Sequence, residues 1–171
     1  MSTLNVRTII ISVGAGLAAV AAVTAVWVAV AVSKAPAHEP EITAYAHGKS
    51  VTVTPFMYCT VRMEDCTYGE TTPLRVPSGM PVQISLPSEI VDSPWLIQLI
   101  YQRPGGEQVD RVLSFADYPA HARALTIESQ PEPDLRLAGI EVQLPILARD
   151  VDTGRESYIP HAAWSIVTPE M

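Results

Sequence analysis

An uninterrupted apolar run from Thr8 to Val32 contains no charged residue, and it constrains this chain more than any other feature. A helix over these residues, at ~1.5 Å per residue, exceeds the ~30 Å hydrocarbon thickness of a bilayer. The run is also longer than the apolar part of a secretory signal peptide, which has about 7 to 15 residues. The sequence therefore predicts a transmembrane anchor over residues 8–32.

A cleavable signal peptide is the competing interpretation of the run. Sites of the A-x-A type, which signal peptidases favour, occur at residues 29–31 and 35–37. The run also consists largely of Ala and Val, which favour membrane insertion only weakly. We expect an uncleaved anchor, and cleavage stays open as the alternative. Because no cysteine precedes Cys59, we expect no lipid anchor on an N-terminal cysteine.

The charges beside the run do not orient it, because Arg7 and Lys34 place one basic residue on each side. An N-terminal helix followed by a folded domain usually leaves its short tail in the cytoplasm. We therefore expect a single-pass protein of the cell membrane. Its parts would be a cytoplasmic tail (residues 1–7), a linker (33–40) and an extracytoplasmic domain (41–169).

The region after the run is acidic, because all 18 Asp and Glu residues lie there. Binding to phosphate backbones needs a basic surface, so we expect no nucleic acid partner. Cys59 and Cys66 enclose a short loop and lie outside any metal-site spacing, which predicts a disulfide formed in an oxidising compartment. Two free thiols are the alternative.

Residues 41–169 alternate apolar and polar side chains with period two and have Pro or Gly at the breaks, which is typical of short strands. The spacing predicts an all-β fold, an antiparallel immunoglobulin-like β-sandwich of about 7–8 strands, with a closed barrel as the alternative. One helical turn is expected within residues 116–123. Trp95 and Trp164 are expected to anchor the core. The expected strands cover residues 41–47, 51–53, 57–61, 81–86, 95–103 (the central strand), 109–115, 124–129, 137–149 and 158–168.

Four blocks occur in a fixed order: PEITAYAHGKSVTVTPFMYC, PVQISLPSEIVDSPWLIQLIY, LAGIEVQLPILARD and PHAAWSIV. With the cysteine pair and the Pro-His-x-x-Trp ending, the chain from Pro40 to Val167 resembles the actinobacterial exported proteins catalogued as domain of unknown function 2771. The resemblance implies a mycobacterial or related origin and an envelope location, and it carries no activity, catalytic residue or cofactor. Some members of that family are described as lipoproteins. This chain lacks the cysteine they need, which favours a protein anchor.

The sequence contains no enzyme signature of the types G-x-S-x-G, H-E-x-x-H, S-x-x-K or a glycine-rich phosphate loop. Ser114, Asp117 and His121 lie close in sequence, but such groupings are too common by chance to predict a catalytic triad. We expect no enzymatic activity, no cofactor and no metal. The histidines are interpreted as surface or strand-end residues rather than metal ligands: His38, His47, His121 and His161.

Two groups of residues are candidates for contact with a partner. Aromatic and methionine side chains gather beside the cysteine loop and would mark an interface if they face solvent, namely Phe56, Met57, Tyr58 and Tyr68. The competing interpretation places half of them in the core. In the apolar run, a small-xxx-small face permits close packing of a second helix, formed by Gly14, Ala18 and Ala22. A generic alanine-rich anchor explains the same three residues.

These observations favour a non-enzymatic accessory or protein-interaction module of the cell envelope, tethered to the lipid bilayer. Its partner would be an integral-membrane protein or a second copy of the chain. The first alternative is an envelope protein that binds a lipid or small ligand in an apolar cavity. The second alternative is a hydrolase with a dispersed site, which requires adjacent titratable groups in one cleft.

Overall fold

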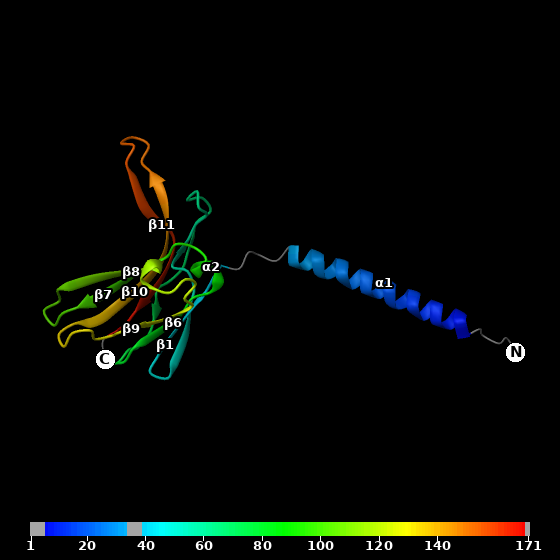
Figure 1. Cartoon of the computed structure of the whole chain (residues 1–171), viewed down its shortest axis with the longest axis horizontal. Coiled ribbons are helices and arrows are strands. Elements are labelled where there is room, and N and C mark those ends of the chain that lie inside the picture. The colour runs from blue at the N-terminus through cyan, green and yellow to red at the C-terminus, as the bar shows by residue number, and fades with distance from the viewer. Residues whose placement is uncertain (1–5, 34–38, 170–171) are drawn as a thin grey trace. The chain divides into compact units, whose positions relative to one another are not determined.

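The computed structural model describes residues 6–33 and 39–169 (Figure 1). The chain divides into two compact units, one containing helix α1 (Val6–Ser33) and one that begins at Glu39. Within α1, the segment Val13–Ser33 is long and apolar enough to cross a membrane, a property that signal sequences near an N-terminus share. The A-x-A site at residues 35–37 and His38 lie outside the described residues.

The second unit is a sandwich of two β-sheets, which confirms the predicted all-β class (Figure 1). The first sheet has the order β2-β1-β6-β9 and consists of β1 (Ile42–Ala46), β2 (Lys49–Val53), β6 (Val82–Ser85) and β9 (Ala124–Ile127). The second has the order β4-β3-β11-β10-β7-β8, with β5 parallel to β11. Its strands are β3 (Met57–Tyr58), β4 (Thr67–Tyr68), β5 (Thr72–Pro73), β7 (Leu96–Gln102), β8 (Gln108–Ser114), β10 (Arg136–Arg149) and β11 (Glu156–Val167).

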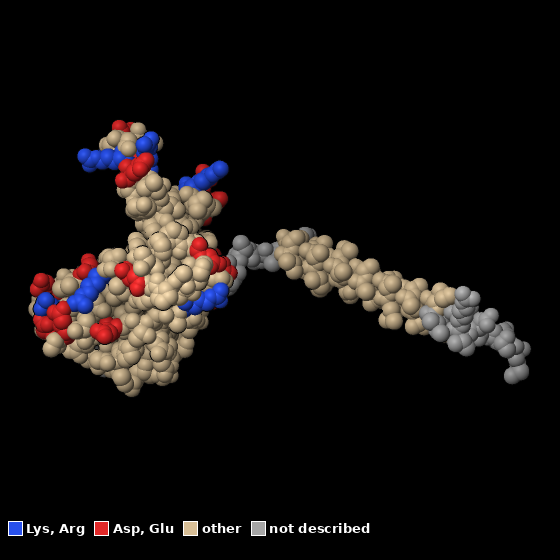
Figure 2. Space-filling model, viewed as in Figure 1, with Lys and Arg blue, Asp and Glu red and all other residues tan. Residues whose placement is uncertain are grey.

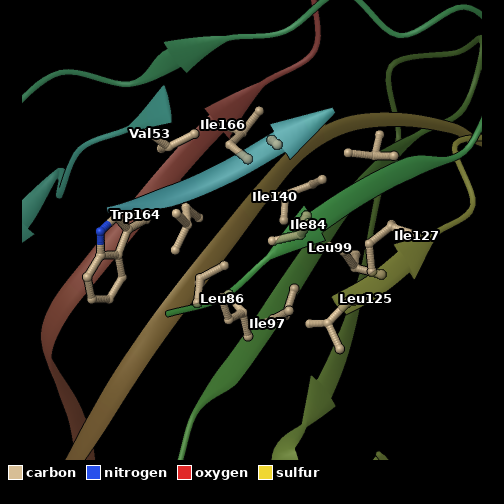
Figure 3. Packing of buried hydrophobic residues seen from close by; sticks show 14 of the residues in the cluster. Val53, Ile84, Leu86, Ile97, Leu99, Leu125, Ile127, Ile140, Trp164 and Ile166 are labelled. Carbon is tan, nitrogen blue, oxygen red and sulfur yellow. The ribbon is translucent and has the colours of Figure 1, made fainter. Parts of the chain in front are cut away.

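The core lies between the sheets, because alternate residues of each strand point inward (Figure 3). In β1 the buried positions alternate with exposed ones along the whole strand, and β7 alternates in the same way. Trp164 is fully buried and Trp95 is 2% exposed, so both act as the predicted core anchors. The indole Nε1 of Trp164 donates a 2.8 Å hydrogen bond to the carbonyl oxygen of Pro40, which fixes the start of the domain against β11.

The structure differs from the expected elements in four places. Helix α2 (Ser88–Val91) was not expected from the sequence pattern, and the expected helical turn is a 3-10 helix, η1 (Phe115–Asp117). The expected strand at residues 57–61 ends at Tyr58, where the cysteine loop begins. Strand β7 is interior but lies next to edge strand β8, and the centre of its sheet is the β10–β11 pair. The two-residue strands β4 and β5 have no counterpart among the expected strands.

The sandwich has two ends, and its strands run between them. Glu39, the start of β1 and helix α2 lie at one end, since Thr43 of β1 pairs with Ser85 of β6 shortly before α2 begins (Figure 1). The β1–β2 turn and the β7–β8 turn at Gly106 lie at the other end. These are called the Glu39 end and the Gly106 end below.

Candidate functional site

The β10–β11 hairpin extends beyond the sandwich at the Glu39 end (Figure 1). Strand β10 pairs with β7 only up to Gln143, and β11 pairs with β3 only at Ala162 and Ala163. Residues 146–159 therefore pair only with each other, and they form what we call the projecting hairpin. Throughout residues 145–161, which the structure describes completely, no side chain belongs to the buried core.

Two prolines mark the point where the hairpin leaves the sheet. Pro145 pairs with Pro160, whereas the preceding residue Leu144 pairs with Ala162, so His161 is an extra residue in β11. Proline has no N–H to donate to a strand ladder and is tolerated at such a bulge, and a bulge bends the strand. The regular sheet therefore ends here, and the end of β10 and the start of β11 take a different direction.

The disulfide loop (residues 59–66) rises beside the projecting hairpin (Figure 1). A disulfide joins Cys59 and Cys66 across it. Because β3 runs antiparallel to β11, the chain after Tyr58 continues in the direction of the hairpin tip. His161 joins the two projections, since its Nδ1 donates a 3.0 Å hydrogen bond to Cys59 O and its own carbonyl oxygen accepts a 2.8 Å bond from Cys59 N–H.

Both projections and their base expose large apolar side chains to solvent. Val151 at the hairpin tip is 95% exposed, and Tyr158 on the shaft is 73% exposed. We call this set the projecting surface, and it consists of Phe56, Val61, Met63, Tyr68, Leu147, Val151 and Tyr158. Exposed apolar groups of this kind, concentrated at one end of a domain, are typical of a contact surface.

Two residues of the sequence-predicted patch are exposed and two are half-buried. Tyr68 is 74% exposed and Phe56 is 41% exposed, so both belong to the projecting surface. Met57 and Tyr58 are half-buried. The Tyr58 and Trp164 rings form an edge-to-face pair with their centroids 6.5 Å apart. Met57 and Tyr58 are therefore partly shielded from solvent, while the Phe56 and Tyr68 side chains are exposed.

Charged residues lie at the tips of the projections rather than along their shafts (Figure 2). At the hairpin tip, Arg149 Nη2 and Glu156 Oε1 form a 3.2 Å ion pair. Asp150 accepts hydrogen bonds from the backbone N–H groups of Asp152 and Thr153 and from the Thr153 hydroxyl. These bonds, those from Thr153 foremost, lower the pKa of the Asp150 carboxyl below its ordinary value, so the carboxylate orders the turn.

A largely apolar cleft of about 320 Å³ lies at the same end of the sandwich, between α2 and the segment after η1. The Trp95 indole forms part of its wall. It packs against the tilted Tyr118 ring, with the two ring centroids 5.6 Å apart. In its lining, His121 Nδ1 and Asp92 Oδ1 lie 3.0 Å apart, within hydrogen-bond distance. The lining consists of Val91, Asp92, Ser93, Pro94, Trp95, Phe115, Pro119, Ala120, His121 and Ala122.

The cleft does not assemble the grouping of Ser114, Asp117 and His121. The Asp117 carboxylate accepts hydrogen bonds from the backbone N–H and the hydroxyl of Ser114, which lower its pKa and cap η1. His121 instead pairs with Asp92, a residue that sequence analysis did not single out. His47 lies at the Gly106 end and His161 at the hairpin bulge, and among the described residues no metal-binding cluster occurs.

The small-residue face of α1 is accessible along its length. Gly14 has no atom beyond its own helix within 4 Å of an added Cβ, and Ala18 and Ala22 are exposed. The Thr24 hydroxyl is bonded to backbone carbonyls of the preceding turn, so it offers no unpaired polar group to lipid. The helix can therefore pack closely against another helix on this side.

Comparison with known proteins identifies the family. The model of the family described as protein of unknown function DUF2771 matches residues 35–169. The chain belongs to the DUF2771 family. Relatives include the uncharacterized proteins Mb0899c of Mycobacterium bovis and Rv0875c of Mycobacterium tuberculosis, each 37% identical over 133 residues, which is 75% of this chain and 76% of theirs. No solved structure matches the chain.

Family membership confirms the resemblance seen in the sequence and covers the whole sandwich. Neither the description of the family nor the names of these relatives give an activity. Sequence reasoning missed the hairpin residues Leu147, Val151 and Tyr158. The available signal was strand length, because the expected strands 137–149 and 158–168 are longer than about six residues, the usual length of a strand in a globular domain.

Proposed function

We propose that this protein is a non-enzymatic, membrane-anchored interaction module of the cell envelope. Helix α1 would remain in the membrane as a single span with its N-terminus in the cytoplasm, and the sandwich would lie outside. The projecting surface would bind an integral-membrane protein or a second copy of the chain. The face at Gly14, Ala18 and Ala22 would add helix-to-helix contact within the bilayer.

The projecting hairpin is the observation that carries this proposal. It contributes no side chain to the buried core, yet it is held in place by the bulge, by the Arg149–Glu156 ion pair and by the capped turn at Asp150. A two-stranded hairpin alone is marginally stable in water. An ordered extension with Leu147, Val151 and Tyr158 exposed is therefore explained best by a contact outside the domain.

Site-specific photo-crosslinking in native membranes tests the proposal. A photoreactive amino acid replaces Val151 or Tyr158 in the full chain, and Val112 serves as the matched control because it is 61% exposed on edge strand β8. We expect specific adducts with a membrane protein, or a dimer adduct, from the hairpin positions but not from position 112. Equal adduct patterns at all three positions would refute the proposal.

A second function, binding of an amphiphilic small molecule, is favoured by the cleft at Trp95. Its apolar walls suit an acyl or aromatic body, and the His121–Asp92 pair at its rim suits a polar head group. The change Ala120→Phe places a ring in the cleft, so it should abolish retention of such a molecule. Native mass spectrometry of the chain purified from its own membranes gives the readout. Absence of any bound mass in the unmodified chain argues against this function.

A further inference from the structure

The Gly106 end contains a pocket of about 260 Å³ that is chemically unlike the cleft at Trp95. Three separate stretches of chain build it: the loop before β6, the end of β7 with the β7–β8 turn, and the stretch that leads from β9 into the start of β10. Its polar lining consists of Ser78, Gln102, Arg103, Gln130, Asp134 and Arg136. We propose that this pocket binds a neutral, hydroxyl-rich ligand of the size of one sugar ring.

The composition of the lining supports a polyol. Amide, guanidinium and carboxylate groups are planar and present paired donors or acceptors, which suits adjacent hydroxyl groups that both donate and accept. Pro104 and Pro133 add small apolar surfaces, against which the C–H face of a ring can lie. The volume is slightly below the ~300–1,000 Å³ usual for ligand pockets, so it admits one small unit.

The polar groups are held in place before a ligand arrives. Arg103 is in contact with Asp134 and lies 3.7 Å from Glu107 and 3.9 Å from Glu132. Gln130 Nε2 donates a 2.8 Å hydrogen bond to Pro133 O, which fixes the plane of its amide. Side chains that are already oriented lose less conformational entropy on binding, which favours affinity for a small ligand.

The balance of charge selects a neutral ligand. The lining contains two guanidinium groups and one carboxylate, while Glu107 and Glu132 stand next to Arg103. An anion would meet these carboxylates, and a cation would meet the guanidinium groups of Arg103 and Arg136. Figure 2 shows positive and negative side chains intermixed at this end of the sandwich rather than a patch of one sign.

Saturation-transfer NMR on the full chain in nanodiscs tests the proposal. The neutral probes are glucose, galactose, mannose and maltotriose, and the charged probes are glucose 6-phosphate, glucuronate and glucosamine. We expect transfer to at least one neutral sugar and weaker transfer to its charged counterparts. Stronger binding of maltotriose than of glucose would identify the end unit of a polysaccharide as the source, and the reverse would identify a free sugar.

Two variants and one control make the test specific to the pocket. Arg103→Ala and Gln130→Ala each remove a lining group and should weaken binding of the neutral sugar about tenfold or more. Arg111→Ala is the control, because Arg111 pairs with Glu132 but does not line the pocket, and it should change affinity less than about threefold. Circular dichroism checks that each variant is folded. The proposal is overturned if no neutral sugar binds the unmodified chain, if charged sugars bind as well, or if both folded lining variants bind normally. Because the pocket lies at the Gly106 end, this result is independent of the crosslinking experiment on the hairpin.

Discussion

Replacing Trp164 by phenylalanine tests how the start of the domain is fixed to its central strand. Trp164 is fully buried in β11, and its indole Nε1 donates a 2.8 Å hydrogen bond to Pro40 O. Pro40 is itself buried. Phenylalanine fills most of the site but cannot donate a hydrogen bond. The Pro40 carbonyl oxygen therefore loses its indole donor in an apolar environment.

The expected loss of stability has two parts. A buried acceptor that loses its donor costs about 1–3 kcal/mol. The smaller ring also leaves a void, and by comparison with large-to-small core changes this adds about 1–2 kcal/mol. The free energy of unfolding should therefore fall by about 2–5 kcal/mol, a large share of the ~5–15 kcal/mol of a typical domain.

Trp95→Phe provides the matched control. Trp95 is 2% exposed and packs on Tyr118, so this change makes a similar void without touching the bond to Pro40. Urea unfolding of the full chain in detergent, followed by the circular dichroism of the sheets, measures both variants. We expect the Trp164 variant to be less stable than the Trp95 variant by about 1–3 kcal/mol. Equal destabilisation of the two variants would refute the role of the hydrogen bond.

Three further predictions concern the projections. Replacing both Cys59 and Cys66 by alanine should lower the free energy of unfolding by about 2–3 kcal/mol, because the short loop is then open in the unfolded chain; unchanged urea midpoints would contradict this. Asp150 has a pKa lowered below the ordinary 3.8, so its ordering of the hairpin turn is complete above that pH and is lost as the pH falls through the lower folded value; if the protection of the Asp152 and Thr153 amides, relative to their intrinsic exchange rate at each pH, does not change in strong acid, this is contradicted. In Gly69→Ala the new Cβ would lie 2.4 Å from Pro55 O, so the backbone must shift at a cost of about 1–3 kcal/mol. The urea midpoint should therefore fall, and an unchanged midpoint would show that the backbone adjusts at no cost.

The sequence predicts much of the sandwich because β1, β6, β7 and β9 alternate inward and outward residues strictly. The alternation over residues 137–149 and 158–168 identifies β10 and β11 to within about two residues. Tryptophans at positions 95 and 164 are large apolar groups within such patterns, and both are buried. These features depend on local spacing, which a single sequence contains.

Features that depend on tertiary contacts could not be predicted in this way. His121 and Asp92 are 29 residues apart and meet only because the segment after η1 packs beside α2. The pocket at the Gly106 end needs three stretches of chain to converge, and no motif links them. Strand β7 looks central because its apolar alternation is the strongest, yet its position next to edge strand β8 is set by the pairing order, which alternation does not encode. An immunoglobulin-like relationship stays a prediction, since no solved structure matches the chain.

The two ends of the sandwich can acquire contacts without changing the core that supports them. At the Glu39 end, the Pro145–Pro160 pair ends the ladder, so residues beyond it form hydrogen bonds only within the hairpin. At the Gly106 end, the pocket is built largely from turns and strand termini, and of its lining only Leu135 belongs to the described buried core. A substitution such as Tyr158→Ser or Gln130→Ala therefore alters a surface while leaving the buried set of β10 and β11 intact.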